Sequence, residues 1–390
     1  MKMDYCKNAG GSVVTAAVVF LAGLWIIYLL YEAKRVKRAR SKMKHIVHVN
    51  GTRGKSSVSR LIEAGLRAGG MRVFCKTTGT DPMTIDVSGG EEPIIRRAGA
   101  NIKEQMGILC RAAEQDAEVL VVECMAIRPE LQYAAQHKIL KADIGVITNV
   151  RRDHTDVMGE TLGEIARALS NTVPKRGALF TAEREPRQAE ILRTAAEKLS
   201  TQFVQVLPDG SEPNFDFAEN IALALRVCEY LGVPRETALM GMRQYHRDPY
   251  ALSIHRWGQS VFINGFSIND VQSICMVWGK VCKEWNLERK RLILLVNNRS
   301  DRGSRTKDMV SVCKMLAPAE IWLLGAAGAY MKRRSEKELP QCAVKNLKNA
   351  AAISDEYMSE DAVIFAVGNI ADGGRRVIQR VREEGEELVP

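Results

Sequence analysis

The sequence contains no C-x-x-C pair, and its nine cysteines are an odd number scattered along 390 residues. This spacing argues against a disulfide framework or a zinc site and favours reduced thiols in the cytosol. Internal repeats and low-complexity segments are absent as well. The apolar and charged contents, 46% and 26%, are those of an ordinary globular protein, and the length suggests two or three domains.

The net charge of +10 is not spread evenly along the chain. Residues 32–44 hold seven lysines and arginines against one glutamate, so six of the ten excess charges lie in this segment. A basic surface spread over a whole domain would favour nucleic acid, whereas a short local excess does not. We therefore expect no nucleic-acid partner.

The nineteen residues from Val13 to Tyr31 carry no charge, which is about enough to span a ~30 Å hydrocarbon core. The basic segment follows this run, so the positive-inside rule places residues 32–390 in the cytoplasm. A cleaved signal peptide is the alternative, but the run is long and no clear small-residue cleavage site precedes the basic segment. We predict a single-pass anchor in the cell membrane within residues 1–44.

The most informative segment reads Val47-His-Val-Asn-Gly-Thr-Arg-Gly-Lys-Ser-Ser57. An apolar run predicts a strand before the glycines, and a helical pattern begins at Lys55. A strand, a glycine loop, Lys-Ser and a helix are typical of a phosphate-binding loop, in which Lys55 reaches the outer phosphates and the Ser56 hydroxyl binds Mg²⁺. Val49 stands where the usual motif has its first glycine, so a plain turn that starts a helix is the alternative.

Two further polar segments follow apolar strands. Glu123 ends the run Val-Leu-Val-Val-Glu, and residues 147–156 read Ile-Thr-Asn-Val-Arg-Arg-Asp-His-Thr-Asp. Ligands collect at the carboxyl ends of strands in open α/β sheets, so we expect both segments to face the phosphate loop. Glu123 would bind Mg²⁺ or orient a phosphate, and His154 with its polar neighbours would serve a second cation. The glycine loop 76–81 would close over phosphates, although a plain turn explains it equally well.

Strands alternate with helical patterns along the rest of the chain, which predicts buried parallel strands covered on both faces. The periodicity stops near Pro249. The expected fold is α/β, with a P-loop parallel-sheet ATPase domain at 45–248 and a smaller Rossmann-like domain at 249–390. The expected strands are 46–50, 119–123, 144–150, 179–181, 204–207, 261–264, 292–296, 321–325 and 363–368, and the expected helices are 55–69, 101–116, 161–173, 186–199, 217–231, 269–284, 307–317, 346–358 and 373–384.

The motifs N-G-T-R-G-K-S-S, T-T-G-T, V-E-C and N-V-x-x-D-H-x-D resemble, in this order, the central domain of Mur-type ATP-dependent amide ligases. The chain is also similar, over roughly residues 13–385, to the ligase subunits of poly-γ-glutamate synthases. The motifs that carry this similarity are K-T-T-G-T-D, E-C-M-A, D-H-T-D-V-M-G, F-I-N-G-F-S-I-N-D, N-N-R-S-D-R and A-V-G-N-I. A single N-terminal anchor belongs to that subunit as well.

The resemblance implies roles for particular residues. Lys55, Glu123 and His154 would be the catalytic residues, and Glu123 and His154 would support magnesium together with Ser56. Asn220 would lie near the adenine. The C-terminal domain would close over the nucleotide and bring Arg299 and Arg302 to the site. The phosphate loop would consist of Gly51, Thr52, Arg53, Gly54, Lys55, Ser56 and Ser57.

Two departures from the family pattern matter. Mur-type ligases begin with a uridine-nucleotide domain, whereas here the anchor leads directly into the first strand of the ATP-binding domain. We therefore expect no UDP-linked substrate. Many members also carry a carbamylated lysine on the helix after the histidine motif, where this chain has Ala168-Leu-Ser-Asn171 and no lysine before Lys175. A second magnesium ion must then be held differently or more weakly.

The resulting hypothesis is a ligase that uses ATP and Mg²⁺ to add glutamate to a growing poly-γ-glutamate chain through an acyl phosphate. It would work beside membrane subunits of a synthase or export complex, and Arg299 and Arg302 would bind carboxylates. Two alternatives stay open. One is a membrane-anchored P-loop ATPase that drives or regulates polymer export without bond formation. The other is a ligase of the folylpolyglutamate kind that acts on a soluble substrate.

Overall fold

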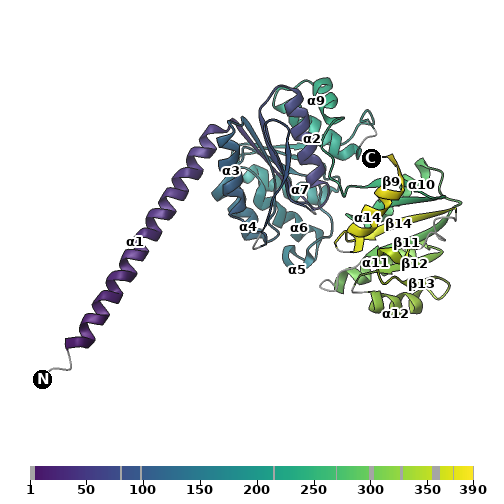
Figure 1. Cartoon of the computed structure of the whole chain (residues 1–390). Coiled ribbons are helices and arrows are strands. Elements are labelled where there is room, and N and C mark those ends of the chain that lie inside the picture. The colour runs from purple at the N-terminus through teal and green to yellow at the C-terminus, as the bar shows by residue number, and fades with distance from the viewer. Residues whose placement is uncertain are drawn as a thin grey trace. The chain divides into compact units, whose positions relative to one another are not determined.

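The computed structural model describes residues 5–79, 81–96, 99–213, 216–268, 270–297, 303–325, 328–353, 361–371 and 373–389. The chain divides into two compact units, Met1–His246 and Arg247–Pro390. Each unit is built on one sheet with helices, so the expected α/β class is confirmed (Figure 1). The expected domain limits at 44/45 and 248/249 stay a prediction.

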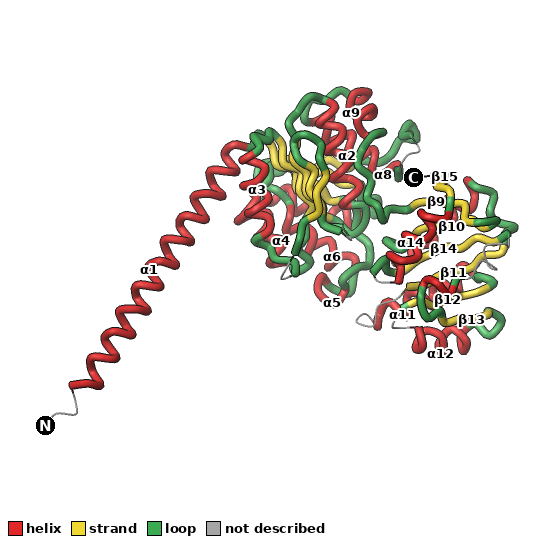
Figure 2. Tube along the Cα trace, in the orientation of Figure 1, coloured by secondary structure: helices red, strands yellow, loops and turns green. Residues whose placement is uncertain are grey.

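The N-terminal helix α1 runs from Tyr5 to Lys42 as one continuous helix (Figure 2). It is the one helix in the described part of the chain that is long and apolar enough to cross a membrane, and its large apolar side chains from Val13 to Tyr31 are exposed. The end of α1 differs, because Val36 and Ala39 are buried in a cluster with residues of α3 (Glu104–Glu114). The last turns of α1 therefore belong to the core of the first unit.

The sheet of the first unit has the strand order β4-β3-β2-β5-β1-β6-β7-β8. Six neighbouring strands, β2-β5-β1-β6-β7-β8, are parallel to one another. At the edge beside β2, the strands β3 and β4 pair antiparallel. The expectation of a purely parallel sheet is therefore corrected at this edge. The strands are β1 (His45–Asn50), β2 (Val73–Lys76), β3 (Met83–Ile85), β4 (Glu91–Pro93), β5 (Val119–Glu123), β6 (Ile144–Ile147), β7 (Ala178–Thr181) and β8 (Gln202–Gln205).

Helices cover both faces of this sheet, with α2 on one face and α3 on the other (Figure 2). The residues of β5 are all buried, as a continuous apolar strand between two helical layers requires. In α2, buried apolar residues recur at helical spacing from Val58 to Leu66. The helices are α2 (Lys55–Ala68), α3, α4 (Pro129–Tyr133), α5 (Thr155–Met158), α6 (Leu162–Leu169), α7 (Pro186–Lys198), α8 (Ala218–Tyr230) and α9 (Arg235–Met242).

The second unit has the strand order β13-β12-β11-β14-β10-β9-β15. Five neighbouring strands, β13-β12-β11-β14-β10, are parallel to one another. The strands β9 and β15 pair antiparallel at the edge beside β10. The strands are β9 (Ser253–Trp257), β10 (Ser260–Gly265), β11 (Arg291–Asn297), β12 (Glu320–Leu324), β13 (Ala343–Asn346), β14 (Ala362–Gly368) and β15 (Glu386–Val389). The helices are α10 (Val271–Glu284), α11 (Gly303–Leu316), α12 (Gly328–Glu338) and α14 (Gly373–Glu384).

Most of the expected elements are present within a few residues of their expected limits, but one helix is wrong at its start. A helix was expected at 346–358. In the structure, Asn346 is the last residue of β13, and a single 3₁₀ turn, Ala350–Ala352, lies within the expected range. Residues 354–360 lie outside the described residues. The sequence also gave no sign of α12, since that helix is rich in charge and buries only Gly328, Met331 and Ser335.

Candidate active site

The loop of residues 51–54, called the glycine loop below, joins β1 to α2 and has left-handed backbone at both glycines. Gly51 has φ +124° and Gly54 has φ +79°, a region that glycine enters at little cost. A Cβ atom on Gly51 would lie 2.1 Å from Thr148 Oγ1, and one on Gly54 would lie 2.6 Å from Asn220 Oδ1. Both positions therefore require glycine for conformation and for space.

The glycine loop is fastened to the segment after β6. The Thr52 hydroxyl donates to Asn149 Oδ1 at 2.8 Å, and the Arg53 amide donates to the same oxygen at 3.1 Å. The Thr148 hydroxyl donates to the Arg53 carbonyl at 2.6 Å. Asn149, one of the polar neighbours expected near a second cation, thus holds the shape of the glycine loop with its side chain.

Glu123 is the meeting point of three segments. Its Oε2 accepts from the Ser56 hydroxyl of α2 at 2.9 Å and from the Thr78 backbone amide at 2.7 Å. Its side chain is buried, and its carbonyl accepts from Gln105 Nε2 at 3.4 Å. The carboxyl end of β5 is thereby joined to the start of α2 and to the loop after β2, as the position of strand ends in a parallel sheet predicts.

Lys55 lies over the glycine loop. Its ammonium donates to the Gly51 carbonyl at 2.9 Å and to the Thr52 carbonyl at 3.4 Å. Both acceptors are neutral, and a phosphate oxygen would make a stronger, charge-assisted bond with the same ammonium. Together with the N-terminus of α2, this arrangement suits a polyphosphate.

The oxygen atoms at Glu123 fit a magnesium ion. Mg²⁺ is usually bound through one or two carboxylates together with substrate phosphates, rather than by a full protein cage. The Glu123 carboxylate and the Ser56 hydroxyl supply such ligands side by side. Within the described residues, no group of three or more histidine, cysteine, aspartate and glutamate side chains could hold a metal ion by itself.

His154 lies beside another pair of charges. It has φ +46°, and its Nε2 is 3.8 Å from Asp153 Oδ2, which is 3.3 Å from the Arg53 guanidinium. The structure thus brings the histidine segment to the glycine loop through Arg53. It does not join His154 to Glu123 in a cluster of metal ligands. A metal role for His154 stays a prediction.

A buried ion network on the α3 side of the sheet was missed from the sequence. Lys76, the last residue of β2, is fully buried, and its ammonium lies 3.0 Å from Glu104 Oε1. Two hydrogen bonds from Arg96, of 2.7 and 2.9 Å, reach the same carboxylate. Burial lowers the pKa of Lys76, and the carboxylates of Glu104 and Glu123 act in the opposite direction. The sequence signal that could have predicted this network is Lys76 itself, a charged residue directly after the apolar residues of β2.

The carboxyl group of Glu104 is held ionised by its partners. Burial by itself would raise its pKa, but the hydrogen bonds from Arg96 and Lys76 hold the pKa below its usual value. The next residue of α3 is Gln105, which bonds the carbonyl of Glu123. The first turn of α3 therefore ties together the ends of β2 and β5.

Asn220, expected near the adenine, lies against the glycine loop at Gly54. Its Nδ2 donates to Asp216 Oδ1 at 2.9 Å, and Tyr245 donates to the other carboxylate oxygen at 2.6 Å. Asp216 and Tyr245 thus orient the amide of Asn220, and neither was predicted from the sequence. The role of Asn220 toward adenine stays a prediction.

Two loops of the second unit were expected at the site. Arg299 and Arg302 lie outside the described residues. Asn264 and Asn297 are buried, and their side-chain amides donate to backbone carbonyls of their own unit, those of Ala251 and of Asn369 and Ala371. These two asparagines therefore hold the loops of the second unit in place.

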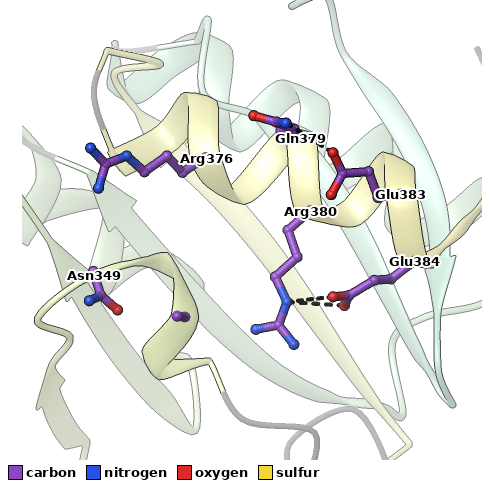
Figure 3. Close-up of a pocket in the computed structure, with 7 residues that line it drawn as sticks. Asn349, Arg376, Gln379, Arg380, Glu383 and Glu384 are labelled. Carbon is purple, nitrogen blue, oxygen red and sulfur yellow. Dashed lines mark hydrogen bonds and ion pairs between the residues drawn. The ribbon is translucent and has the colours of Figure 1, made fainter.

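A shallow hollow lies over α14 in the second unit (Figure 3). Arg380 pairs there with Glu384 through both carboxylate oxygens, at 2.9 and 3.0 Å. The lining residues are Asn349, Ala351, Arg376, Gln379, Arg380, Glu383 and Glu384. None of the residues predicted for nucleotide binding is among them.

The fold is that of the folylpolyglutamate synthases and defines a Mur-type ligase architecture. E. coli FolC in complex with ADP superposes with a TM-score of 0.69 at 15% identity, over 93% of this chain and 98% of that chain. A bifunctional folylpolyglutamate synthase/dihydrofolate synthase from Yersinia pestis, complexed with AMPPNP and Mn ion, gives 0.65 at 16% identity, over 93% and 97%. At these identities the likeness concerns the fold alone.

Sequence comparison then gives the family. The Mur ligase middle domain matches residues 49–217, and the poly-gamma-glutamate synthase CapB C-terminal domain matches residues 250–384. Capsule biosynthesis protein CapB of Bacillus anthracis is 34% identical over 94% of this chain and 83% of its own length. PGA synthase CapB of Bacillus subtilis (strain 168) is 32% identical over 95% and 97%. The chain belongs to this CapB family of poly-γ-glutamate synthases.

Proposed function

We propose that this chain is an ATP-dependent amide ligase that adds glutamate to a growing poly-γ-glutamate chain, with release of ADP and phosphate. Membership of the CapB family supports the polymer, and the Mur ligase middle domain supports the ligase chemistry. The observation that carries the proposal is the Glu123 carboxylate, which binds the Ser56 hydroxyl and the Thr78 amide beside the glycine loop. These groups would supply nucleotide and metal ligands at the adjacent carboxyl ends of β1 and β5.

The residues of this site have separate tasks in the proposed reaction. The amides of the glycine loop and the start of α2 bind the phosphates of ATP as a P-loop does, and Lys55 leaves its carbonyl partners to offset charge on the transferred group. Glu123 and Ser56 would hold Mg²⁺, which supplies charge neutralisation at the phosphates. The backbone around Gly54 and the side chain of Asn220 would place the nucleotide.

The proposed chemistry proceeds in two transfers. A terminal carboxylate of the acceptor attacks the γ-phosphorus, the bond to ADP breaks, and an acyl phosphate forms. The amine of the incoming glutamate then attacks the acyl carbon, loses a proton, and expels phosphate as the amide forms. Neither transfer needs a covalent enzyme nucleophile, so positioning and electrostatics account for the rate. Arg299 and Arg302 of a Rossmann-like second domain would bind substrate carboxylates or the γ-phosphate.

We also propose that the apolar part of α1 spans the cell membrane, with both units in the cytoplasm beside membrane partners of a synthase complex. The exposed apolar run of α1 and the basic residues after it support this location. We propose three domains: the membrane anchor at 1–44, the ATP-binding domain at 45–248 and the C-terminal domain at 249–390. ATP is a cytoplasmic substrate, so the location and the chemistry agree.

The test measures whether ATP hydrolysis depends on glutamate and is accompanied by formation of an amide. Membranes that contain this chain should convert labelled glutamate into a γ-linked polymer, with ADP and phosphate formed only when glutamate is present. Hydrolysis of ATP that is independent of glutamate and yields no amide would favour an ATPase of polymer export. Selective extension of a folate would favour the soluble-substrate ligase.

A further inference from the structure

The structure sorts six of the seven cations in the basic segment after the apolar run of α1 into two groups, and the seventh, Arg40, is half-buried. In the first group, each cation has an acidic partner on the first unit. Arg35 pairs with Glu114 at 3.0 Å, and Lys42 pairs with Asp116 at 3.4 Å. Lys44 pairs with Glu118.

The second group consists of Lys34, Lys37 and Arg38, called the free basic face below. All three are exposed, and within the described residues none of them has an ion pair or a side-chain hydrogen bond. The acidic residues at the end of α3 and in the segment that follows it are taken by the first group. Among the described residues, the structure therefore leaves three exposed cations in one short stretch of helix without a counter-charge, beside the half-buried Arg40.

The free basic face points away from the protein core. Val36 and Ala39, on the opposite side of α1, are each 7% exposed and pack in the cluster that contains α3. With about 3.6 residues per turn, Lys34, Lys37 and Arg38 share one face of the helix, roughly half a turn from these two residues. The fold of the first unit thus decides which cations remain available to another partner.

The depth of these residues agrees with a membrane surface. At about 1.5 Å per residue, Lys34 lies ~4.5 Å and Arg38 ~10.5 Å beyond Tyr31, the last residue of the apolar run. The headgroup layer on each side of a bilayer is roughly 5–8 Å thick. Long basic side chains bend toward the polar layer, so all three can reach it. α1 is unbroken to Lys42, and the spacing therefore carries directly from the apolar run to the face.

We propose that Lys34, Lys37 and Arg38 form a docking face for anionic phospholipid headgroups. The proposal rests on the membrane location given under the proposed function. Phosphate oxygens supply the counter-charge that the protein itself does not, and the planar guanidinium of Arg38 can bind two of them at once. Because Val36 and Ala39 of the same turns are packed in the first unit, bound headgroups would set the height and rotation of that unit at the membrane.

The test uses the full-length chain in nanodiscs of phosphatidylcholine with a minor fraction of phosphatidylglycerol. Phosphatidylglycerol that stays bound to the protein after mild detergent extraction is measured by mass spectrometry. One variant carries Lys34→Gln, Lys37→Gln and Arg38→Gln. The matched control carries Arg35→Gln, Lys42→Gln and Lys44→Gln, which removes the same charge from the same segment.

We expect wild type and the control variant to retain phosphatidylglycerol several-fold above its share of the bilayer. The variant of the free basic face should lose most of this enrichment. Equal losses in both variants, or no enrichment in wild type, would overturn the proposal. Displacement of the lipid by soluble polyglutamate at low concentration would reassign the face to the polymer.

A parallel assay separates this proposal from the proposed function. Lys55→Ala should retain the lipid enrichment of wild type even if it makes no amide. Lipid enrichment in a chain that makes no amide under any condition would refute the ligase and leave the docking face intact. Amide synthesis by wild type without lipid enrichment would do the reverse.

Discussion

At the carboxyl ends of β5 and β2, the two faces of the first sheet use polar residues differently. On the α2 face, the Ser56 hydroxyl donates to Glu123 next to the glycine loop, for which we propose phosphate binding. On the α3 face, Lys76 and Glu104 form an ion pair that is largely closed to water. We propose a ligand for the first arrangement, whereas the second pairs its charges within the protein. Polar residues at one sheet edge can therefore bind a ligand or hold the strands that position it.

The largest expected effect is that of Lys55→Ala on the α2 face. Without the ammonium, charge on the transferred phosphoryl group is not offset, and the rate of amide formation should fall by at least roughly a hundredfold. The measurement is polymer formed per mole of folded protein in membranes. The exposed Lys198→Ala is the control and should be unaffected. Substantial activity in Lys55→Ala would contradict the phosphate role of the loop.

Glu123→Gln should act through the metal. It keeps the shape of the side chain and removes its charge, so the Mg²⁺ concentration for half-maximal activity should rise by about 10–100-fold. ATP affinity, measured by equilibrium binding, should change less. The exposed Glu130→Gln serves as the control. An unchanged magnesium titration would mean that Glu123 is structural, like the pair on the other face.

Glu104→Gln should act on stability. The substitution leaves the Lys76 ammonium buried without a carboxylate, which typically costs about 3–5 kcal/mol of unfolding free energy. Denaturant unfolding measures this cost. The double variant Lys76→Met, Glu104→Gln should lose less than Glu104→Gln alone, because the fully buried ammonium is removed and the remaining partner, Arg96, is only partly buried. A raised magnesium requirement with unchanged stability would move this pair to the ligand side of the comparison.

His154→Ala should give a smaller rise in the magnesium requirement than Glu123→Gln, since His154 lies beside Asp153 and Arg53 and not in a cluster with Glu123. Magnesium titrations of both variants under the same conditions decide the order. Equal shifts would show that His154 comes to the metal when nucleotide is bound.

The smallest expected effect is on the stability of the first unit, when the end of α1 that packs on α3 is removed. Removal of residues 1–31 keeps Val36 and Ala39 on α3, so the stability of the first unit should be unchanged and the chain should become soluble. Removal of residues 1–44 uncovers this contact and should cost about 1–3 kcal/mol, by the area rule for buried side chains. Thermal unfolding of the two truncated chains compares them. Identical curves would make α1 a tether alone.

Local patterns were sufficient for the elements with strong periodicity. The strand before the glycine loop, the helix from Lys55 and the apolar run to Glu123 could be predicted because glycine, helical spacing and buried β-strands leave clear signals. Short or polar elements left weaker ones. The strands β2, β3, β4, β9, β13 and β15 and the helices α9 and α12 were not predicted, and a segment that contains only a 3₁₀ turn in its described part was predicted as a helix.

The sequence alone determined the glycine loop, the apolar run from Val13 to Tyr31 and the family, since each depends on residues that are neighbours in the chain or on motifs in a given order. Only the tertiary structure decided that Lys76 pairs with Glu104, that Asn220 lies against Gly54, and which cations of the basic segment remain unpaired. These contacts join residues that are far apart in sequence. Burial and charge at such places depend on how helices pack on the sheet, and no local pattern records that packing.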